Sequence, residues 1–307
     1  MATPHSVLQF IALAQARSER TALIVLAGIE GGAARGLGTV MGVSATGDWL
    51  GSLSGGCVEA ALVGEAQRVI AAGQPELLRI GAGSPLIDIR LPCGSAIDLL
   101  LVPDPDPAAI TQVLNLLDRR SAAVLKLGTQ GPVAARSAKA ADETSWTDAR
   151  FTLRIDPPLR LIIAGHGEEV PALAALARTW GAKVLVLTPD ERIAEACGPD
   201  AVFLAMHGPH PALVLDRWTA LVMLFHDHDW EVPLLAQALA QDALFIGAMG
   251  STTTHGRRLG ALADAGVTAA DAARVQGPIG LIPATRDPQS LALSILAQVV
   301  AAYTGRT

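Results

Sequence analysis

A glycine-rich turn that carries a cysteine is the stretch of this chain best suited to chemistry. Residues 51–62 (GSLSGGCVEAAL) lead from that turn directly into a helical pattern. Gly55 and Gly56 allow backbone angles that other residues avoid, so the chain can approach a ligand closely. Cys57 then stands near a helix N-terminus, where the helix dipole stabilises a thiolate or a bound phosphate. The alternative, a tight turn with a buried and inert cysteine, stays open.

A second cysteine lies in the turn formed by residues 91–95 (LPCGS). Pro92 and Gly94 predict a turn between two strand-like runs, which exposes Cys93 at a strand end. The sequence leaves open whether Cys57 and Cys93 share one site.

A charged candidate follows the first predicted strand. Arg35 lies in the loop 33–38 (AARGLG). A guanidinium beside a glycine-rich helix start is suited to holding phosphate. A solvated loop arginine is the equally open alternative.

The second half of the chain contains a glycine turn typical of nucleotide-binding folds. An apolar strand is predicted at 159–164, followed by Gly165 and Gly167 and then by a helix at 170–180 and a strand at 183–187. This is the βαβ opening of a Rossmann-like domain, in which a pyrophosphate would lie on the glycine turn.

Three features of this turn argue against tight NAD(P) binding. Val170 stands where a third glycine or alanine is usual, and Thr188 replaces the acidic residue that binds ribose. Asp190 is the candidate substitute for that acid. Glu168 and Glu169 place negative charge at a helix start that would need free N–H groups for phosphate.

Two further motifs follow predicted strands of this half. In residues 225–229 (FHDHD), His226 and His228 would share one face of an extended segment and could bind a metal or phosphate. Alternatively, Asp229 caps the next helix. In residues 247–259 (GAMGSTTTHGRRL), an anion could bind N–H groups of Gly250 and Ser251, with positive charge from His255, Arg257 and Arg258. We expect one of the two arginines to face a cleft, although surface arginines are the alternative.

Together these motifs give the chain a resemblance to a known family. The cysteine-bearing turns, the FHDHD block and the GAMGSTTTHGRRL block resemble those of the xanthine dehydrogenase accessory factor family, XdhC/CoxI. Ser95 stands where the family has a glycine. In the second half, Glu168 stands in place of a histidine and Thr188 in place of an acid. Asp190, Thr252 and Thr253 each stand in place of an arginine.

The resemblance implies a chaperone that binds molybdenum cofactor and delivers it to a molybdenum hydroxylase of the xanthine dehydrogenase, CO dehydrogenase or aldehyde oxidase type. Cys57 would lie near the molybdenum, with Cys93 as a second candidate. The implied cofactor-binding residues are Arg35, Gly55, Gly56, Cys57, Glu59, Cys93, Gly165, Gly167, Asp190, His226, His228, Gly250, Ser251, His255, Arg257 and Arg258.

Two other functions compete with the carrier role. An NAD(P)-dependent oxidoreductase would use the Rossmann-like half together with a reactive cysteine. A sulfurtransferase would carry a persulfide on Cys57, supplied by a partner such as a cysteine desulfurase.

The helices and strands expected around these residues predict an α/β protein of two domains. We expect a mixed α/β domain at 1–136, a linker at 137–158 and a Rossmann-like parallel-sheet domain at 159–307. In the first domain, helices are expected at 6–16, from 58 and at 108–118, and strands at 21–27, 39–43, 96–102 and 122–127. In the second, further strands are expected at 201–205, 220–225 and 244–248, and further helices at 192–196, 232–240, 254–263 and 288–302.

The amino-acid composition and the net charge argue against some classes of binding partner. The chain has 307 residues, of which 50% are hydrophobic and 17% charged, as in well-packed globular proteins. A net charge of −6 argues against nucleic acid or an anionic membrane as the main partner. Three cysteines favour a reducing cytoplasm, and we expect no membrane span. Whether the chain forms a homodimer is open.

Overall fold

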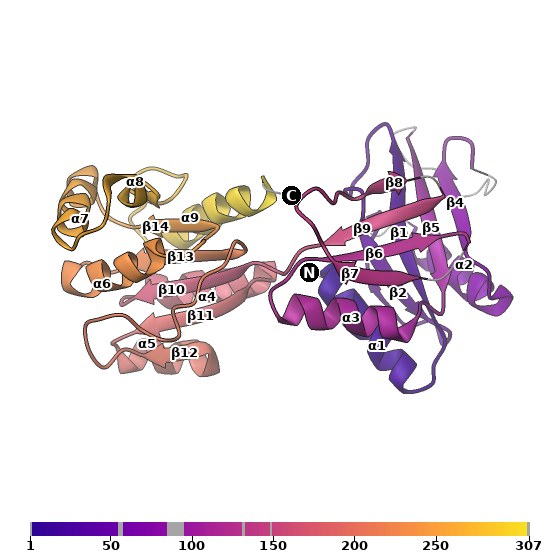
Figure 1. The fold of residues 1–307 in the computed structure, drawn as a ribbon, viewed down its shortest axis with the longest axis horizontal. Helices are drawn as coiled ribbons and strands as arrows, with labels where there is room; N and C mark the ends of the chain where they lie inside the picture. Colours follow the sequence, from indigo (N-terminus) through magenta and orange to yellow (C-terminus); the bar gives the residue numbers. More distant parts are fainter. Residues whose placement is uncertain (1, 55–57, 85–94, 131–132, 148, 306–307) are drawn as a thin grey trace. The chain divides into compact units, whose positions relative to one another are not determined.

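The computed structural model describes residues 2–54, 58–84, 95–130, 133–147 and 149–305 (Figure 1). The chain divides into two compact units, Met1–Pro157 and Pro158–Thr307, called here the first and second units. The linker expected at 137–158 is therefore wrong for most of its length. Strands β8 (Ser145–Thr147) and β9 (Arg150–Ile155) lie within it and belong to a sheet of the first unit. The polar composition of residues 137–150 reflects exposed strand and turn positions, not a connection between domains.

An antiparallel sheet, sheet A, forms the centre of the first unit. Its order is β3 (Trp49–Gly51), β2 (Val40–Ser44), β1 (Thr21–Glu30), β5 (Ala96–Pro103) and β4 (Glu76–Gly81). Helix α2 (Glu59–Ala72) packs on one face of this sheet through Leu62, Ala66 and Val69. The α2 helix begins one residue after the position that its spacing predicts.

The other face of sheet A is covered by two helices and a smaller sheet. These are α1 (Pro4–Ala16), α3 (Pro107–Asp118) and sheet B, in the order β7 (Ala134–Ser137), β6 (Ala123–Gly128), β9 and β8. All three contribute to one core with β1 and β5. Helices α1 and α3 each begin with a side-chain cap, from Thr3 or Asp106, followed by proline, which suits the first helical position.

The second unit is built on a parallel sheet, as its alternating pattern predicts. Its order is β12 (Ala201–Phe203), β11 (Lys183–Thr188), β10 (Arg160–Gly165), β13 (Thr219–Leu224), β14 (Phe245–Ala248) and β15 (Val275–Gln276). The described helices of this unit are α4 (Glu169–Trp180), α5 (Glu191–Cys197), α6 (His228–Leu239), α7 (Thr252–Asp264), α8 (Ala269–Ala272) and α9 (Pro288–Thr304), with a short 3-10 turn at Gly198–Asp200.

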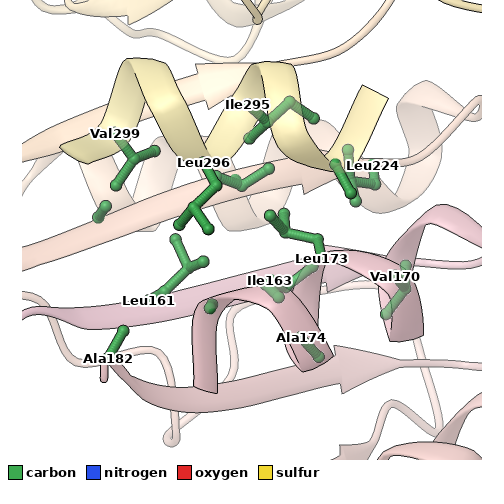
Figure 2. Packing of buried hydrophobic residues seen from close by; sticks show 14 of the residues in the cluster. Leu161, Ile163, Val170, Leu173, Ala174, Ala182, Leu224, Ile295, Leu296 and Val299 are labelled. Carbon is green, nitrogen blue, oxygen red and sulfur yellow. The ribbon is translucent and has the colours of Figure 1, made fainter. Parts of the chain in front are cut away.

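Both faces of this sheet are buried. Leu161 and Ile163 of β10 point to one face, where Leu173 of α4 and Ile295 of α9 meet them (Figure 2). Ile162 and its neighbours point to the other face, toward α6 and α7. Because successive strand residues alternate between faces, a continuous apolar run is what a sheet covered on both sides requires. Each fully buried Leu or Ile stabilises the fold by about 1.5–3 kcal/mol.

The predicted fold class is confirmed; the differences are several strands that were not expected, among them β3, β4, β7, β8, β9 and β15, and shifts at element ends. β1 runs on to Glu30, although a loop was expected from Gly28, because a bulge between Leu26 and Gly28 lets the strand continue its pairing with β5. Among the described residues, no helix is long and apolar enough to span a bilayer.

Candidate functional site

The carboxylate of Glu59 holds both ends of the cysteine-bearing turn. Its Oε1 accepts hydrogen bonds from the Ser52 hydroxyl (2.8 Å) and from the backbone N–H groups of Leu53 and Ser54 (3.0 Å each). Its Oε2 accepts from the Ser54 hydroxyl (2.8 Å) and from the N–H of Val58 (3.2 Å). A single buried side chain therefore binds the backbone on both sides of the three residues between Ser54 and Val58.

These contacts set the charge of Glu59. Burial alone would raise the pKa of its carboxyl, but hydrogen bonds from the Ser54 N–H and from the Ser52 and Ser54 hydroxyls outweigh burial and lower the pKa to about 2. Glu59 is 6% exposed. A carboxylate whose lone pairs are taken by protein donors has little capacity left for a ligand. Its place in the structure is that of a positioning residue.

The central residues of the two cysteine-bearing turns, Gly55, Gly56, Cys57 and Cys93, lie outside the described residues. The residues directly after the second turn are described, and they lie beside the end of β4. Gly81 at the end of β4 pairs with Ala96 at the start of β5, and the N–H of Ala82 donates to the Ser95 carbonyl (3.1 Å).

The flanks of both turns lie at the same end of sheet A. Strand β3 runs into the first turn in the direction of Glu30, at the end of β1, and Glu30 pairs with Ala96 directly after the second turn. Leu53 and Val58, on either side of the first turn, share one core cluster with Ile97. This arrangement is the basis for treating one end of the sheet as the candidate site. That the two cysteines meet there remains a prediction.

Arg35 lies in the loop that joins β1 to β2 at this end of the sheet. It is half-buried. The loop is fixed to the strand by two backbone hydrogen bonds of 2.8 Å, from Gly38 N–H to the Leu26 carbonyl and from Leu26 N–H to the Thr39 carbonyl. The position suits the predicted anion clamp, which stays a prediction.

An ion-pair cluster that was not expected from the sequence lies at the same end. The Arg79 guanidinium contacts the carboxylates of Glu30 and Asp98 and donates to the Ala82 carbonyl (2.9 Å). Arg79 and Asp98 are cross-strand neighbours in the β4–β5 register. The pairing becomes visible only when the strand partners are known, because nearly twenty residues separate the two in sequence.

The second unit places its candidate residues at the carboxyl edge of the parallel sheet. Numbered within this unit, its strand order is 3-2-1-4-5-6, and the order reverses between β10 and β13. Ligands of open α/β sheets bind at such a reversal. Gly165 ends β10 there, where a Cβ would lie 2.6 Å from the Leu224 carbonyl oxygen, so only glycine fits.

The glycine turn after β10 is covered by a side chain of the chain itself. Gly167 has φ +115°, and both carboxylate oxygens of Glu169 lie 3.0 Å from the position that a Cβ on Gly167 would take. The Glu169 side chain is 15% exposed. A carboxylate thus stands over the turn on which a pyrophosphate would lie.

Asp190 serves as a helix cap. Its Oδ1 accepts hydrogen bonds from the N–H groups of Arg192 (2.8 Å) and Ile193 (3.4 Å) at the start of α5. Thr188, at the end of β11 where the ribose acid is usual, is fully buried. The ribose role of Asp190 stays a prediction, and the cap alone accounts for an acidic residue at this position.

The two histidines of the FHDHD block have different environments, contrary to the shared face expected of an extended segment. His228 lies in the first turn of α6, and its Nδ1 is 3.0 Å from Glu231 Oε2. His226 is 74% exposed, and its Nε2 lies 3.8 Å from Glu169 Oε1. The expected cap at Asp229 is also wrong: Asp227 caps α6 by accepting from the Asp229 N–H (2.9 Å), because the helix begins earlier than its apolar spacing suggests.

The block after β14 starts α7 as expected. Gly250 has φ +128°, and the exposed Ser251 caps the helix by accepting from the Thr254 N–H (3.1 Å). These two residues lie at the carboxyl edge of the sheet. Their role toward an anion is not tested by the fold.

Arg258, expected as one of two arginines that could face a cleft, is a structural residue. It is fully buried, pairs with both oxygens of Glu231 (3.0 Å each) and donates to the Met249 carbonyl (2.6 Å). Its guanidinium therefore ties α7 to α6 and is not free for a ligand. Arg257 is exposed. His255 lies 3.3 Å from Arg258, and burial, followed by the Arg258 charge, lowers its pKa.

Metal-binding groups are sparse in the part of the chain that the structure describes. No group of three or more His, Cys, Asp or Glu side chains there could hold a metal ion. Cys197 is buried in the core of the second unit, and burial raises the pKa of its thiol, as for an inert cysteine.

Comparison with known proteins adds to this geometry. Residues 14–81 match the XdhC and CoxI family, and residues 161–299 match the XdhC Rossmann domain. The molybdenum cofactor insertion chaperone PaoD of Escherichia coli (strain K12) is 33% identical over 301 residues, which cover 96% of this chain and 87% of PaoD. The chain belongs to the XdhC and CoxI family. The resemblance noted from the sequence is thereby confirmed.

A solved structure of this architecture supports the fold of the XdhC and CoxI chain. It is described as a xanthine dehydrogenase from Bacillus halodurans and is similar with a TM-score of 0.77 at 21% identity, covering 98% of this chain and 96% of that one.

Proposed function

We propose that this XdhC and CoxI family protein binds molybdenum cofactor and delivers it to a molybdenum hydroxylase. The observation that carries the proposal is the 33% identity to PaoD, named a molybdenum cofactor insertion chaperone, over 96% of the chain. A carrier needs no chemical turnover, and its affinity must permit release of the cargo. Delivery takes place in the cytoplasm, where thiols remain reduced.

The first unit is the proposed cofactor site. The Glu59 carboxylate fixes both flanks of the turn that contains Cys57 in sequence. A thiolate is a soft ligand suited to a metal such as molybdenum, and only the deprotonated sulfur binds. The start of α2 directly follows the turn, so its N–H groups and dipole favour the thiolate. Arg35, at this end of sheet A, is a further candidate, and so is Cys93, which lies outside the described residues.

The oxidoreductase alternative has less support. Glu169 lies over the glycine turn, and Thr188 is buried where an acid would bind ribose. At these positions a dinucleotide would lack its usual contacts for the pyrophosphate and for the ribose. Sulfur transfer through a persulfide on Cys57 is compatible with the carrier role, with a cysteine desulfurase as donor.

A transfer assay tests the proposal. The purified protein is loaded with molybdenum cofactor, separated from free cofactor and mixed with the apo form of a molybdenum hydroxylase. We expect hydroxylase activity to appear in proportion to the loaded protein, and to be lost with Cys57→Ala. Activity that appears equally with free cofactor and with the loaded protein contradicts a carrier role. Mass spectrometry of Cys57 after incubation with a cysteine desulfurase separates sulfur transfer from simple delivery.

A further inference from the structure

We propose that Glu169 closes the phosphate subsite of the second unit and thereby excludes dinucleotides and free phosphates from the carboxyl edge of its parallel sheet. This inference concerns nucleotide selectivity and is independent of cofactor binding by the first unit.

The subsite is defined by topology. In a sheet of this order, phosphate binds at the turn after the first strand, against the N-terminus of the next helix. Here the first strand is β10, the turn contains Gly165 and Gly167, and the helix is α4. The requirements for close backbone approach are met, since Gly165 packs against Leu224 and Gly167 has a positive φ. The turn itself therefore retains the form of a phosphate-binding turn.

The Glu169 side chain occupies the space over that turn. Both of its carboxylate oxygens lie 3.0 Å from the position of a Cβ on Gly167. A side chain that is 15% exposed and folded over a glycine fills part of the volume that a phosphate would need. Its negative charge also lies at the positive end of the α4 dipole, where it takes the place of an external anion.

The carboxylate of Glu169 has no close partner among the described contacts. Its ion-pair contact is with His226, whose Nε2 lies 3.8 Å from Oε1 and carries charge only when protonated. That distance is too long for a hydrogen bond, and the imidazole is 74% exposed to water. The carboxylate thus repels an incoming phosphate in addition to blocking it sterically.

Pyrophosphate is the probe that tests this subsite alone, because it needs no ribose or base contact. Binding to the full chain is measured by titration calorimetry for the wild type, Glu169→Ala and Glu169→Gln. Glu168→Ala is the matched control, since it removes the same charge from the same helix start at an exposed residue. Circular dichroism and thermal unfolding establish that each variant is folded.

We expect pyrophosphate affinity to rise at least tenfold in Glu169→Ala and to change less than threefold in Glu168→Ala. Glu169→Gln keeps the size but removes the charge, so an intermediate gain is expected. Tight binding by the wild type overturns the proposal, as does an unchanged affinity in Glu169→Ala. An equal gain in Glu168→Ala also overturns it, because the effect would then reflect general charge and not occupation of the turn.

Discussion

The carboxylate of Glu59 accepts hydrogen bonds from five donors that belong to the turn and helix start around Cys57. At the residue scale this explains why an acidic side chain stands two positions after the cysteine. A glutamate there would otherwise oppose a thiolate. Because protein donors occupy the lone pairs of its buried carboxylate, Glu59 fixes the backbone on both sides of the turn.

We predict that Glu59→Gln removes a pH-dependent part of the stability. The folded-state pKa of about 2 lies below the ordinary 4.5, so the carboxylate stabilises the fold fully above pH 4.5. That contribution is lost as pH falls from 4.5 to 2. The difference corresponds to roughly 3 kcal/mol at neutral pH. Urea unfolding at pH 7 and pH 3 measures it.

The control for this change is Glu65→Gln on the same helix, whose carboxylate pairs with Arg68 at the surface. It should alter stability by less than about 1 kcal/mol. Equal losses in the two variants, or an unchanged pH dependence in Glu59→Gln, would show that Glu59 has no special role.

A second residue-scale prediction concerns the buried arginine. Arg258→Ala removes the arginine that pairs with both oxygens of the buried Glu231 carboxylate and leaves it the contact with His228, which costs about 3–5 kcal/mol. Its exposed neighbour supplies the comparison, since Arg257→Ala should change stability by less than about 0.5 kcal/mol. Calorimetric melting of both variants decides between this structural role and a ligand-binding one.

At the scale of elements, we expect alanine to have opposite effects on stability at a glycine of strand β10 and at a glycine of helix α7. Gly165→Ala places a Cβ 2.6 Å from the Leu224 carbonyl oxygen and must separate β10 from β13, so we expect a loss of at least about 2 kcal/mol. Gly256 lies within α7 with nothing within 4 Å of a Cβ, and Gly256→Ala should stabilise by about 0.5–1 kcal/mol. Chemical denaturation of the two variants would contradict this account if both lost stability.

Most helices and strands could be predicted from the sequence because their apolar residues follow a recognisable pattern. The strands around β10 and β13 are continuous apolar runs, and α4 and α9 alternate as amphipathic helices do. The short strand β8 and strand β9 were missed, since β8 is exposed and the alternating apolar residues of β9, Phe151, Leu153 and Ile155, directly follow a polar stretch. Their place in the sheet explains them, since β9 pairs with β6 and β8 pairs with β9.

The site was less predictable than the fold. The cysteine turns and Glu59 follow from local sequence, but the contact between Arg79 and Asp98 depends on strand register. Arg257 and Arg258 are adjacent and chemically identical, yet one is exposed and the other fully buried. The helix phase relative to α6 decides which of them is available, and sequence spacing alone does not give that phase.

At the scale of the whole molecule, each unit has its own buried core. Cores on the two faces of sheet A belong to the first unit, and those on the two faces of the parallel sheet belong to the second. We therefore expect local destabilisation to stay within one unit. In hydrogen exchange, Arg258→Ala should raise exchange within 158–307 and leave 1–157 unchanged. Faster exchange in α2 would contradict the independence of the two cores.

The measurement that tests the central claim most directly is molybdenum cofactor binding to the full chain, wild type against Cys57→Ala and Glu59→Gln. Ultrafiltration with molybdenum quantified by mass spectrometry is sufficient. The account predicts near-stoichiometric binding by the wild type, loss in Cys57→Ala and weakening in Glu59→Gln, with Glu65→Gln unchanged. Absence of binding by the wild type, or full binding by Cys57→Ala, would contradict a cofactor carrier whose site is the turn held by Glu59.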